Sequence, residues 1–242
     1  MNPDYIIVCL FCLGFLYASV GHGGASGYIA TFSLAGVAVP VYRPLVLLLN
    51  IIVSGSAFLQ FKKAGYFKWR LIVPFLVTSI PFAYLGAKFP LKGEVYNVLL
   101  GLALVFPIAR LLQLGPAEKR ETKDLPLFSG LLFGAVLGFA AGLLNIGGGI
   151  FLSPVLMLMG WANSKQSATA SAFFIFCNSI AGLISIKNQS FFVADHSWIW
   201  FFSAISGGIL GAYFGSNLYR QKTVRYVLAS VMAVACAKLL FF

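Results

Sequence analysis

Long apolar runs, separated by short polar segments, follow one another along the whole chain. The runs cover residues 5–20, 25–38, 43–61, 71–87, 95–114, 127–144, 149–160, 166–186, 197–218 and 223–242. Most of them are long enough for a helix that crosses the ~30 Å hydrocarbon core of a bilayer. Two are shorter, and each follows a glycine-rich string, GHGGASG (21–27) or NIGGG (145–149). The pattern predicts an all-α integral membrane protein, a polytopic bundle of eight main spans in which each glycine-broken element counts as one unit.

The chain also resembles itself when it is shifted by 124 residues. The shift aligns LGF (13–15) with LGF (137–139), GG (23–24) with GG (147–148) and, after one inserted residue, LGA (85–87) with LGA (210–212). We therefore expect a tandem duplication, with a first repeat at 1–114, a charged linker at 115–126 and a second repeat at 127–242. Each repeat opens with one of the two glycine-broken elements.

The composition supports the prediction of a membrane protein and changes what the net positive charge indicates. The chain is 60% hydrophobic and 10% charged, whereas an ordinary soluble domain is about half apolar and about a quarter charged. The net charge of +11 comes from 17 Lys and Arg against 6 Asp and Glu. In a soluble protein this excess indicates nucleic acid. Here the basic residues lie between apolar runs, so they report topology, and the expected partner is the lipid bilayer with no nucleic acid.

The distribution of positive charge favours one arrangement of the repeats. If each broken element turns back to the side it came from, the basic residues divide 12 to 5 between the two sides. If each crosses once, they divide 10 to 7. Cytoplasmic loops carry the excess of Lys and Arg, so the first division is preferred. It predicts inverted-topology repeats, a plan common in secondary transporters, with both termini periplasmic and the linker cytoplasmic. Whether 25–38 and 149–160 span fully or are re-entrant stays open.

The two glycine strings are candidates for an anion site. A broken helix exposes backbone N–H groups at the start of its second part, where the helix dipole is positive. Anions bind at such ends. The candidate residues are His22, Gly23, Gly24, Ser26, Asn145, Gly147, Gly148 and Gly149. His22, whose side chain titrates near neutral pH when unperturbed, could also couple protons or simply pack. The alternative for the glycines is that they only let helices pack closely.

Polar residues recur at helical spacing after each glycine string. They are Arg43, Asn50 and Ser54 in the first half, and Ser167, Thr169, Ser171, Asn178 and Ser185 in the second. Steps of 4, 7 and 11 return to one helical face, so most of these side chains should face inward and contact substrate. Hydrogen bonding that only holds the helices together is the alternative. Arg43 either contacts an anion directly or extends its charge to the membrane surface.

Several kinds of chemistry lack the residues they need. All six acidic residues lie outside the apolar runs or at their ends, so cation coupling through buried carboxylates is not expected. There is no phosphate-binding loop of the GxxxxGK[ST] type. Cys9, Cys12, Cys177 and Cys236 are expected to be buried packing residues, because no partner ligands accompany them. We therefore expect no cofactor, no metal and no catalytic residues, and an anionic or neutral substrate.

These motifs resemble the TauE/SafE sulfite exporter family. The resemblance is carried by VGHGGASGY (20–28), LNIGGGIFLSP (144–154), RPLVLLLN (43–50) and SATAS (167–171), and it covers essentially the whole chain. Ala25 and Thr169-Ala170-Ser171 depart from the usual family pattern. The resemblance implies a multi-pass transporter of the bacterial inner membrane, for sulfite, sulfonates or related sulfur-containing organic acids, with substrate held between inverted repeats.

The expected function is a secondary transporter that exports a small anion, first of all sulfite, by alternating access between two inverted repeats. A passive anion channel and a membrane-embedded enzyme acting on a lipid or a sulfur compound are the alternatives. A homodimer is left open. The sequence does not fix the coupling ion or the exact substrate.

Overall fold

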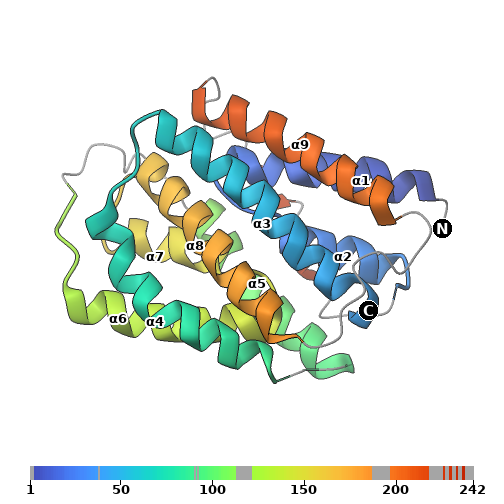
Figure 1. Cartoon of the computed structure of the whole chain (residues 1–242), viewed down its shortest axis with the longest axis horizontal. Coiled ribbons are helices and arrows are strands. Elements are labelled where there is room, and N and C mark those ends of the chain that lie inside the picture. The colour runs from blue at the N-terminus through green and yellow to red at the C-terminus, as the bar shows by residue number, and fades with distance from the viewer. Residues whose placement is uncertain are drawn as a thin grey trace.

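The computed structural model describes residues 3–37, 39–89, 91, 93–112, 122–186 and 197–217, and a few near the end of the chain. The described residues form helices and no strand. The helices are α1 (Pro3–Ser19), α2 (Ala25–Leu34), α3 (Val39–Lys63), α4 (Trp69–Ala87), α5 (Gly93–Leu112), α6 (Leu127–Leu144), α7 (Gly149–Leu158), α8 (Ser164–Ser185) and α9 (Ser197–Asn217). Figure 1 shows their arrangement in one bundle.

The helices follow the apolar runs closely, and five of them are long and apolar enough to cross a membrane. These five segments are Tyr42–Lys63, Trp69–Ala87, Leu127–Leu144, Ser164–Ser185 and Trp198–Asn217. The shorter apolar helices include α7, which has only ten residues. The protein is therefore a multi-pass membrane protein, as the hydrophobic pattern predicts. Most of the last apolar run, 223–242, lies outside the described residues.

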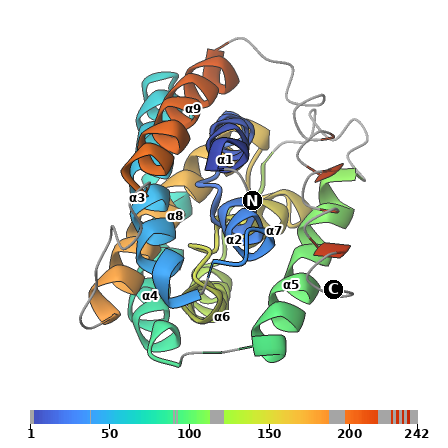
Figure 2. The ribbon, with the colours of Figure 1, turned by 90° about the vertical axis from the view of Figure 1, so that its right-hand side faces the viewer.

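The two ten-residue helices turn back toward the helices that precede them. Tyr17, near the end of α1, forms a 2.7 Å hydrogen bond through its hydroxyl with Ser26 Oγ, in the first turn of α2. At the other glycine string, the Gly160 carbonyl just after α7 accepts a 2.8 Å hydrogen bond from the backbone N–H of Lys123, shortly before α6 begins. The end of α7 thus returns to the level at which α6 starts. Figure 2 shows α2 and α7 in the middle of the bundle.

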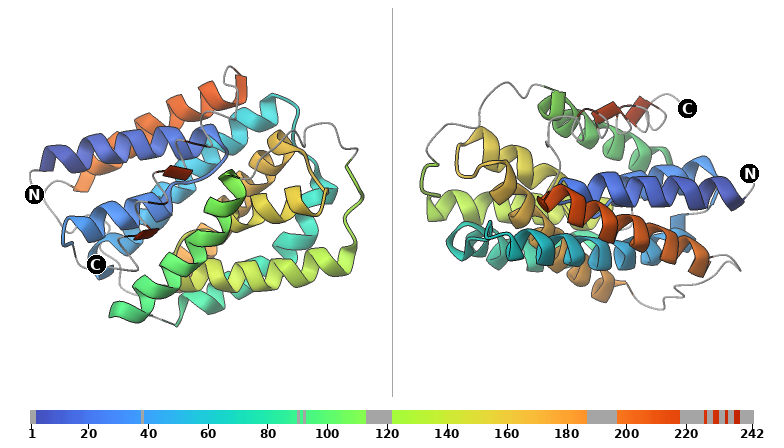
Figure 3. Two further views of the ribbon diagram at one scale, coloured as in Figure 1. Left: turned by 180° about the vertical axis from the view of Figure 1, so that it is seen from behind. Right: turned by 90° about the horizontal axis from the view of Figure 1, so that it is seen from above.

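The faces of α6 and α9 that meet their main neighbours are lined by glycine. The glycines recur every fourth residue, at Gly130, Gly134, Gly138 and Gly142 on α6 and at Gly207, Gly211 and Gly215 on α9. A Cβ at Gly138 would collide with the Ser79 carbonyl oxygen of α4, and one at Gly211 with the Phe15 carbonyl oxygen of α1. Small residues at this spacing let helix backbones approach closely in membranes. Figure 3 shows α1 and α9 side by side.

The contacts between α4 and α6 recur at corresponding positions between α1 and α9. Thr78 Oγ1 of α4 donates to the Leu131 carbonyl oxygen of α6 at 2.7 Å. Ser203 Oγ of α9 donates to the Ile7 carbonyl oxygen of α1 at 2.6 Å. Leu131 follows Ile7 by 124 positions, and Ser203 follows Thr78 by 125. The same bond is therefore made twice, each time between a helix of one half and a helix of the other.

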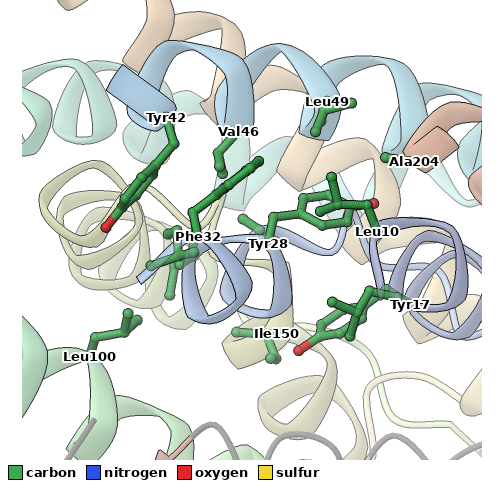
Figure 4. Packing of buried hydrophobic residues seen from close by; sticks show 14 of the residues in the cluster. Leu10, Tyr17, Tyr28, Phe32, Tyr42, Val46, Leu49, Leu100, Ile150 and Ala204 are labelled. Atoms are coloured by element: carbon green, nitrogen blue, oxygen red, sulfur yellow. The ribbon is translucent and has the colours of Figure 1, made fainter. Parts of the chain in front are cut away.

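A large buried cluster encloses α2 and fixes its position. Phe32 of α2 is fully buried, and its ring stacks on that of Tyr42 of α3 with centroids 5.5 Å apart and planes 14° apart. Trp200 of α9 contacts the same ring at 5.4 Å. Figure 4 shows this packing around Phe32 and Tyr28. Because aromatic side chains bury large areas, the cluster holds α2, and the glycine string before it, firmly against α3.

Candidate functional site

Both glycine strings are tight turns with left-handed backbone. Gly21 and Gly24 have φ of +79° and +93° in the first string, and Asn145 and Gly148 have φ of +57° and +77° in the second. Each residue of the second pair follows its counterpart in the first by 124 positions. Glycine adopts this conformation freely, and asparagine tolerates it better than most residues. The turns before α2 and α7 are therefore alike at these two positions, although Gly147 also has a φ of +69° and its counterpart Gly23 has no positive φ. Each turn leads into a helix N-terminus.

The side chain of Asn50, in the middle of α3, lies between the two glycine strings. It is fully buried, and its Oδ1 accepts a 3.2 Å hydrogen bond from the backbone N–H of Ala25, the first residue of α2. A Cβ at Gly23 would collide with this oxygen, and one at Gly147 would lie 3.2 Å from Nδ2. Because a backbone N–H can only donate, the oxygen must face α2 and the amide NH₂ must face the second string.

Two further residues with buried polar groups lie next to each other on α8, and one of them, Ser179, faces the second glycine string. Ser179 is fully buried, and a Cβ at Gly147 would lie 2.9 Å from its Oγ. In the described part of the protein, neither this hydroxyl nor Asn50 Nδ2 has a hydrogen-bond partner. Both carboxamide atoms of Asn178, the residue before Ser179, are likewise buried without a partner among the described residues. Since an unsatisfied buried polar group costs roughly 1–3 kcal/mol, these groups point to a ligand or water.

Other predicted side chains already bond within the protein. Ser26 bonds to Tyr17, and Ser171 Oγ lies 2.7 Å from Ser153 Oγ, with both residues buried. The hydroxyls of Ser54 and Thr169 each donate to a carbonyl oxygen one turn earlier in their own helix. His22 is buried, and its backbone N–H donates to the Tyr17 carbonyl oxygen at 2.8 Å. The hydroxyls of Ser26, Ser54, Thr169 and Ser171 thus have protein partners.

Arg43, predicted to contact the substrate, joins three parts of the fold. Its Nε donates to Asn145 Oδ1 at 2.7 Å, and its Nη2 donates to the Ala87 carbonyl oxygen at 2.7 Å. Ala87 is the last residue of α4, where the helix dipole is negative, so the guanidinium stabilises that end. Through Asn145 the same side chain holds the turn between α6 and α7. These two bonds give Arg43 a positioning role beside the second glycine string.

The remaining glycines of the site are closely packed. Gly24 faces the Tyr28 ring, so that a Cβ there would lie 2.7 Å from the Tyr28 hydroxyl. A Cβ at Gly149 would lie 2.5 Å from Ile175 Cγ1, and one at Gly148 would lie 2.9 Å from the Phe174 ring. The structure thus brings Gly23, Asn50 and Gly147 together with residues of α8. Ser179 and Tyr28 are buried at this place and were absent from the sequence prediction.

The cysteine prediction is wrong for two of the four residues. Cys9 and Cys12 are exposed on α1, whereas Cys236 is buried and Cys177 half-buried. An apolar run does not say which face of its helix packs inward, and in α1 the faces differ little in hydrophobicity. On a membrane helix an exposed cysteine faces lipid. Among the described residues, no three His, Cys, Asp or Glu side chains gather as metal ligands would.

Five helices long and apolar enough to cross a membrane, with buried polar groups without a described partner near two glycine turns, are typical of a membrane transport protein. Comparison with known families identifies which one. The chain belongs to the sulfite exporter TauE/SafE family, whose profile matches residues 6–239. It is a membrane transporter.

Individual relatives agree with this assignment. The chain is 33% identical over 243 residues to a "probable membrane transporter protein" of Sinorhizobium fredii, covering 98% of this chain and 97% of that protein. It is 24% identical to a protein of the same description from Bacillus subtilis, over 81% of this chain and 78% of that protein. A third such protein, from Methanocaldococcus jannaschii, is 27% identical over 74% of this chain and 70% of its own length. No solved structure matches the chain significantly.

Proposed function

We propose that this transporter exports a small oxyanion, sulfite or a related sulfur oxyanion or organosulfonate, and binds it where the two glycine turns meet. The observation that carries the proposal is the Asn50 side chain, which bonds to the start of α2 and presents its buried NH₂ group to Gly147. Ser179 Oγ lies beside the same glycine. Hydrogen-bond donors near two helix N-termini suit an anion. The family name supplies sulfite as the first candidate.

The site residues predicted from sequence divide into two groups under this proposal. Asn50, Gly23, Gly147 and Asn178, with Ser179, are the groups closest to the anion. The others shape the turns or hold the helices around them: His22, Gly24, Ser26, Arg43, Ser54, Asn145, Gly148, Gly149, Thr169 and Ser171. Arg43 acts on the anion through Asn145, by fixing the second turn.

We further propose that the two halves are inverted repeats that exchange partners across the bundle. The paired bonds of Thr78 with Leu131 and of Ser203 with Ile7 support this, because an exact exchange of the halves converts one bond into the other. The boundaries proposed from sequence, 1–114 and 127–242 with the linker 115–126, place each helix pair across both repeats. Alternating access would then move the two exchanged helix pairs, α1 with α9 and α4 with α6, relative to each other around the site.

The flux experiment separates this carrier from a channel. The purified protein in proteoliposomes loaded with sulfite should give efflux that saturates with internal sulfite. External unlabelled sulfite should drive counterflow of labelled sulfite, because a carrier site faces one side at a time. An inside-negative potential should speed efflux, since each charge gains about 2.3 kcal/mol per 100 mV. Non-saturating flux without counterflow would instead establish a channel, and no sulfite flux at all would exclude the proposed substrate.

The topology gives a separate prediction. We expect the loop 88–94 and both termini in the periplasm, and 62–70, 110–125 and 219–225 in the cytoplasm. The return of α7 to the start of α6 and the packing of Gly27 of α2 against Leu13 of α1 support it, because each broken element then begins and ends on one side. In a variant with all four cysteines replaced by alanine, an impermeant maleimide applied to intact cells should label Lys88→Cys and leave Lys68→Cys unlabelled. The reverse pattern would disprove this orientation.

A further inference from the structure

The side chains of Asn50 and Ser179, which face the meeting point of the two glycine turns, are neutral, and the titratable side chain of the first turn, His22, is buried. Asn50 offers a carboxamide NH₂ and Ser179 a hydroxyl, each buried and without a partner among the described residues. Such groups bind an oxyanion by hydrogen bonds and supply no formal counter-charge. The charge that the site can balance must therefore come from elsewhere.

The half-buried basic side chains of the described helices are committed to other partners. Arg43 donates to Asn145 and to the Ala87 carbonyl oxygen. Lys165 Nζ donates to the Ser216 carbonyl oxygen at 2.8 Å, near the end of α9, and lies 5.0 Å from the centre of the Tyr66 ring. The other basic residues whose side chains are described are exposed: Lys62, Lys63, Lys68, Arg70, Lys88 and Lys123.

The helix ends supply a positive charge of limited size. α2 and α7 each have ten residues, and both begin at the glycine turns that meet at Asn50. A helix N-terminus carries the equivalent of about half an elementary charge. Two of them together give about one positive charge. This amount balances a monoanion and leaves about one charge of a dianion uncompensated, at a place where the lining side chains are buried.

We infer that the site is selective for singly charged oxyanions, such as hydrogensulfite and alkyl sulfonates, over doubly charged ones, such as sulfite dianion and sulfate. The inference rests on the proposed function and adds the charge state of its substrate. Removing an ion from water is costly, and the cost rises steeply with its charge. Neutral donors together with about one positive charge offset the cost of removing a singly charged anion from water. They do not offset the larger cost of removing a doubly charged one.

Two probes of similar shape test the charge rule directly. Methanesulfonate is a monoanion and sulfate a dianion across the neutral pH range, and both are tetrahedral at sulfur, with three oxygens in methanesulfonate and four in sulfate. Calorimetry on the purified, folded protein at constant ionic strength should give methanesulfonate an affinity about tenfold or more above that of sulfate. Sulfate binding as tightly as methanesulfonate, or more tightly, would overturn the inference and leave an oxyanion site in place. Failure of methanesulfonate, sulfate and sulfite alike to bind would overturn the proposed function itself.

A pH series provides an independent measurement. Sulfite and hydrogensulfite interconvert near neutral pH, whereas methanesulfonate keeps one charge. As the pH falls through this range, the ratio of the affinity for total sulfite to that for methanesulfonate should rise in proportion to the hydrogensulfite fraction, because any change at His22 in the first glycine string acts on both anions. A ratio that rises with pH would show that the dianion is the bound species and would overturn the inference.

Discussion

The Asn50→Asp variant is expected to fold and to lose sulfite export. Aspartate keeps an oxygen that can accept from the Ala25 N–H, so the start of α2 retains its partner. It replaces the NH₂ group beside Gly147 with a second oxygen and adds a negative charge. A hydrogen bond to a charged group contributes roughly 1.5–3 kcal/mol, so its loss alone weakens binding about ten- to hundredfold. Repulsion between like charges lowers the affinity further.

The measurement is sulfite efflux from proteoliposomes at neutral pH, where a carboxyl group is ordinarily ionised and hydrogensulfite is still present, together with thermal unfolding of the purified variant. Asn217→Asp is the control for the added charge, because Asn217 is exposed at the end of α9, where its NH₂ group donates to the Tyr213 carbonyl oxygen. It should export as wild type does. A folded Asn50→Asp protein that exports at the wild-type rate would show that the anion does not pass within reach of this side chain.

Gly138→Ala is expected to destabilise the protein, although alanine is a better helix former than glycine. The added methyl group would meet the Ser79 carbonyl oxygen, which belongs to the backbone of α4 and cannot rotate away. The two helices must separate, and overpacking of this kind costs about 1–3 kcal/mol, occasionally more. Gly211→Ala, in the pair formed by α1 and α9, should have a similar effect, because it faces the Phe15 carbonyl oxygen.

Gly182→Ala is the control for both glycine variants. A Cβ at Gly182 of α8 would lie 3.7 Å from the methyl groups of Leu47, an ordinary contact. Alanine should therefore be neutral there or stabilise the helix by roughly 0.5–1 kcal/mol. Thermal unfolding in one detergent would compare the three variants. Equal stability of Gly138→Ala and Gly182→Ala would show that α4 and α6 are farther apart in the membrane than the structure places them.

The sequence was sufficient for the helices because burial in lipid demands long apolar runs. The expected runs 127–144 and 71–87 became α6 (Leu127–Leu144) and α4 (Trp69–Ala87) almost without change. The two short runs, 25–38 and 149–160, were also predicted as separate elements, since a glycine string stands at the start of each. Each of these helices depends on residues close together in the chain, so a single sequence is enough to predict it.

Contacts between distant parts of the chain were harder to predict. Arg43 was expected to bind substrate because it is a strong charge on an inward face, and nothing in the sequence places Asn145 or Ala87 beside it. Ser179 was missed for a simpler reason. It lies eight positions after Ser171, a spacing that shares the helical face as a spacing of seven does, so the polar stripe was drawn too narrowly.

The exchanged pairing of helices has a consequence for biosynthesis. α1 is made first, and the helix that covers it, α9, is nearly the last described helix to be made. α4 likewise waits for α6. During synthesis α1 therefore enters the bilayer long before α9 has been made. The glycine string that follows α1 is then not yet packed against the second half of the chain. The first half cannot complete its own packing, and the bundle closes only when the second half has entered the membrane.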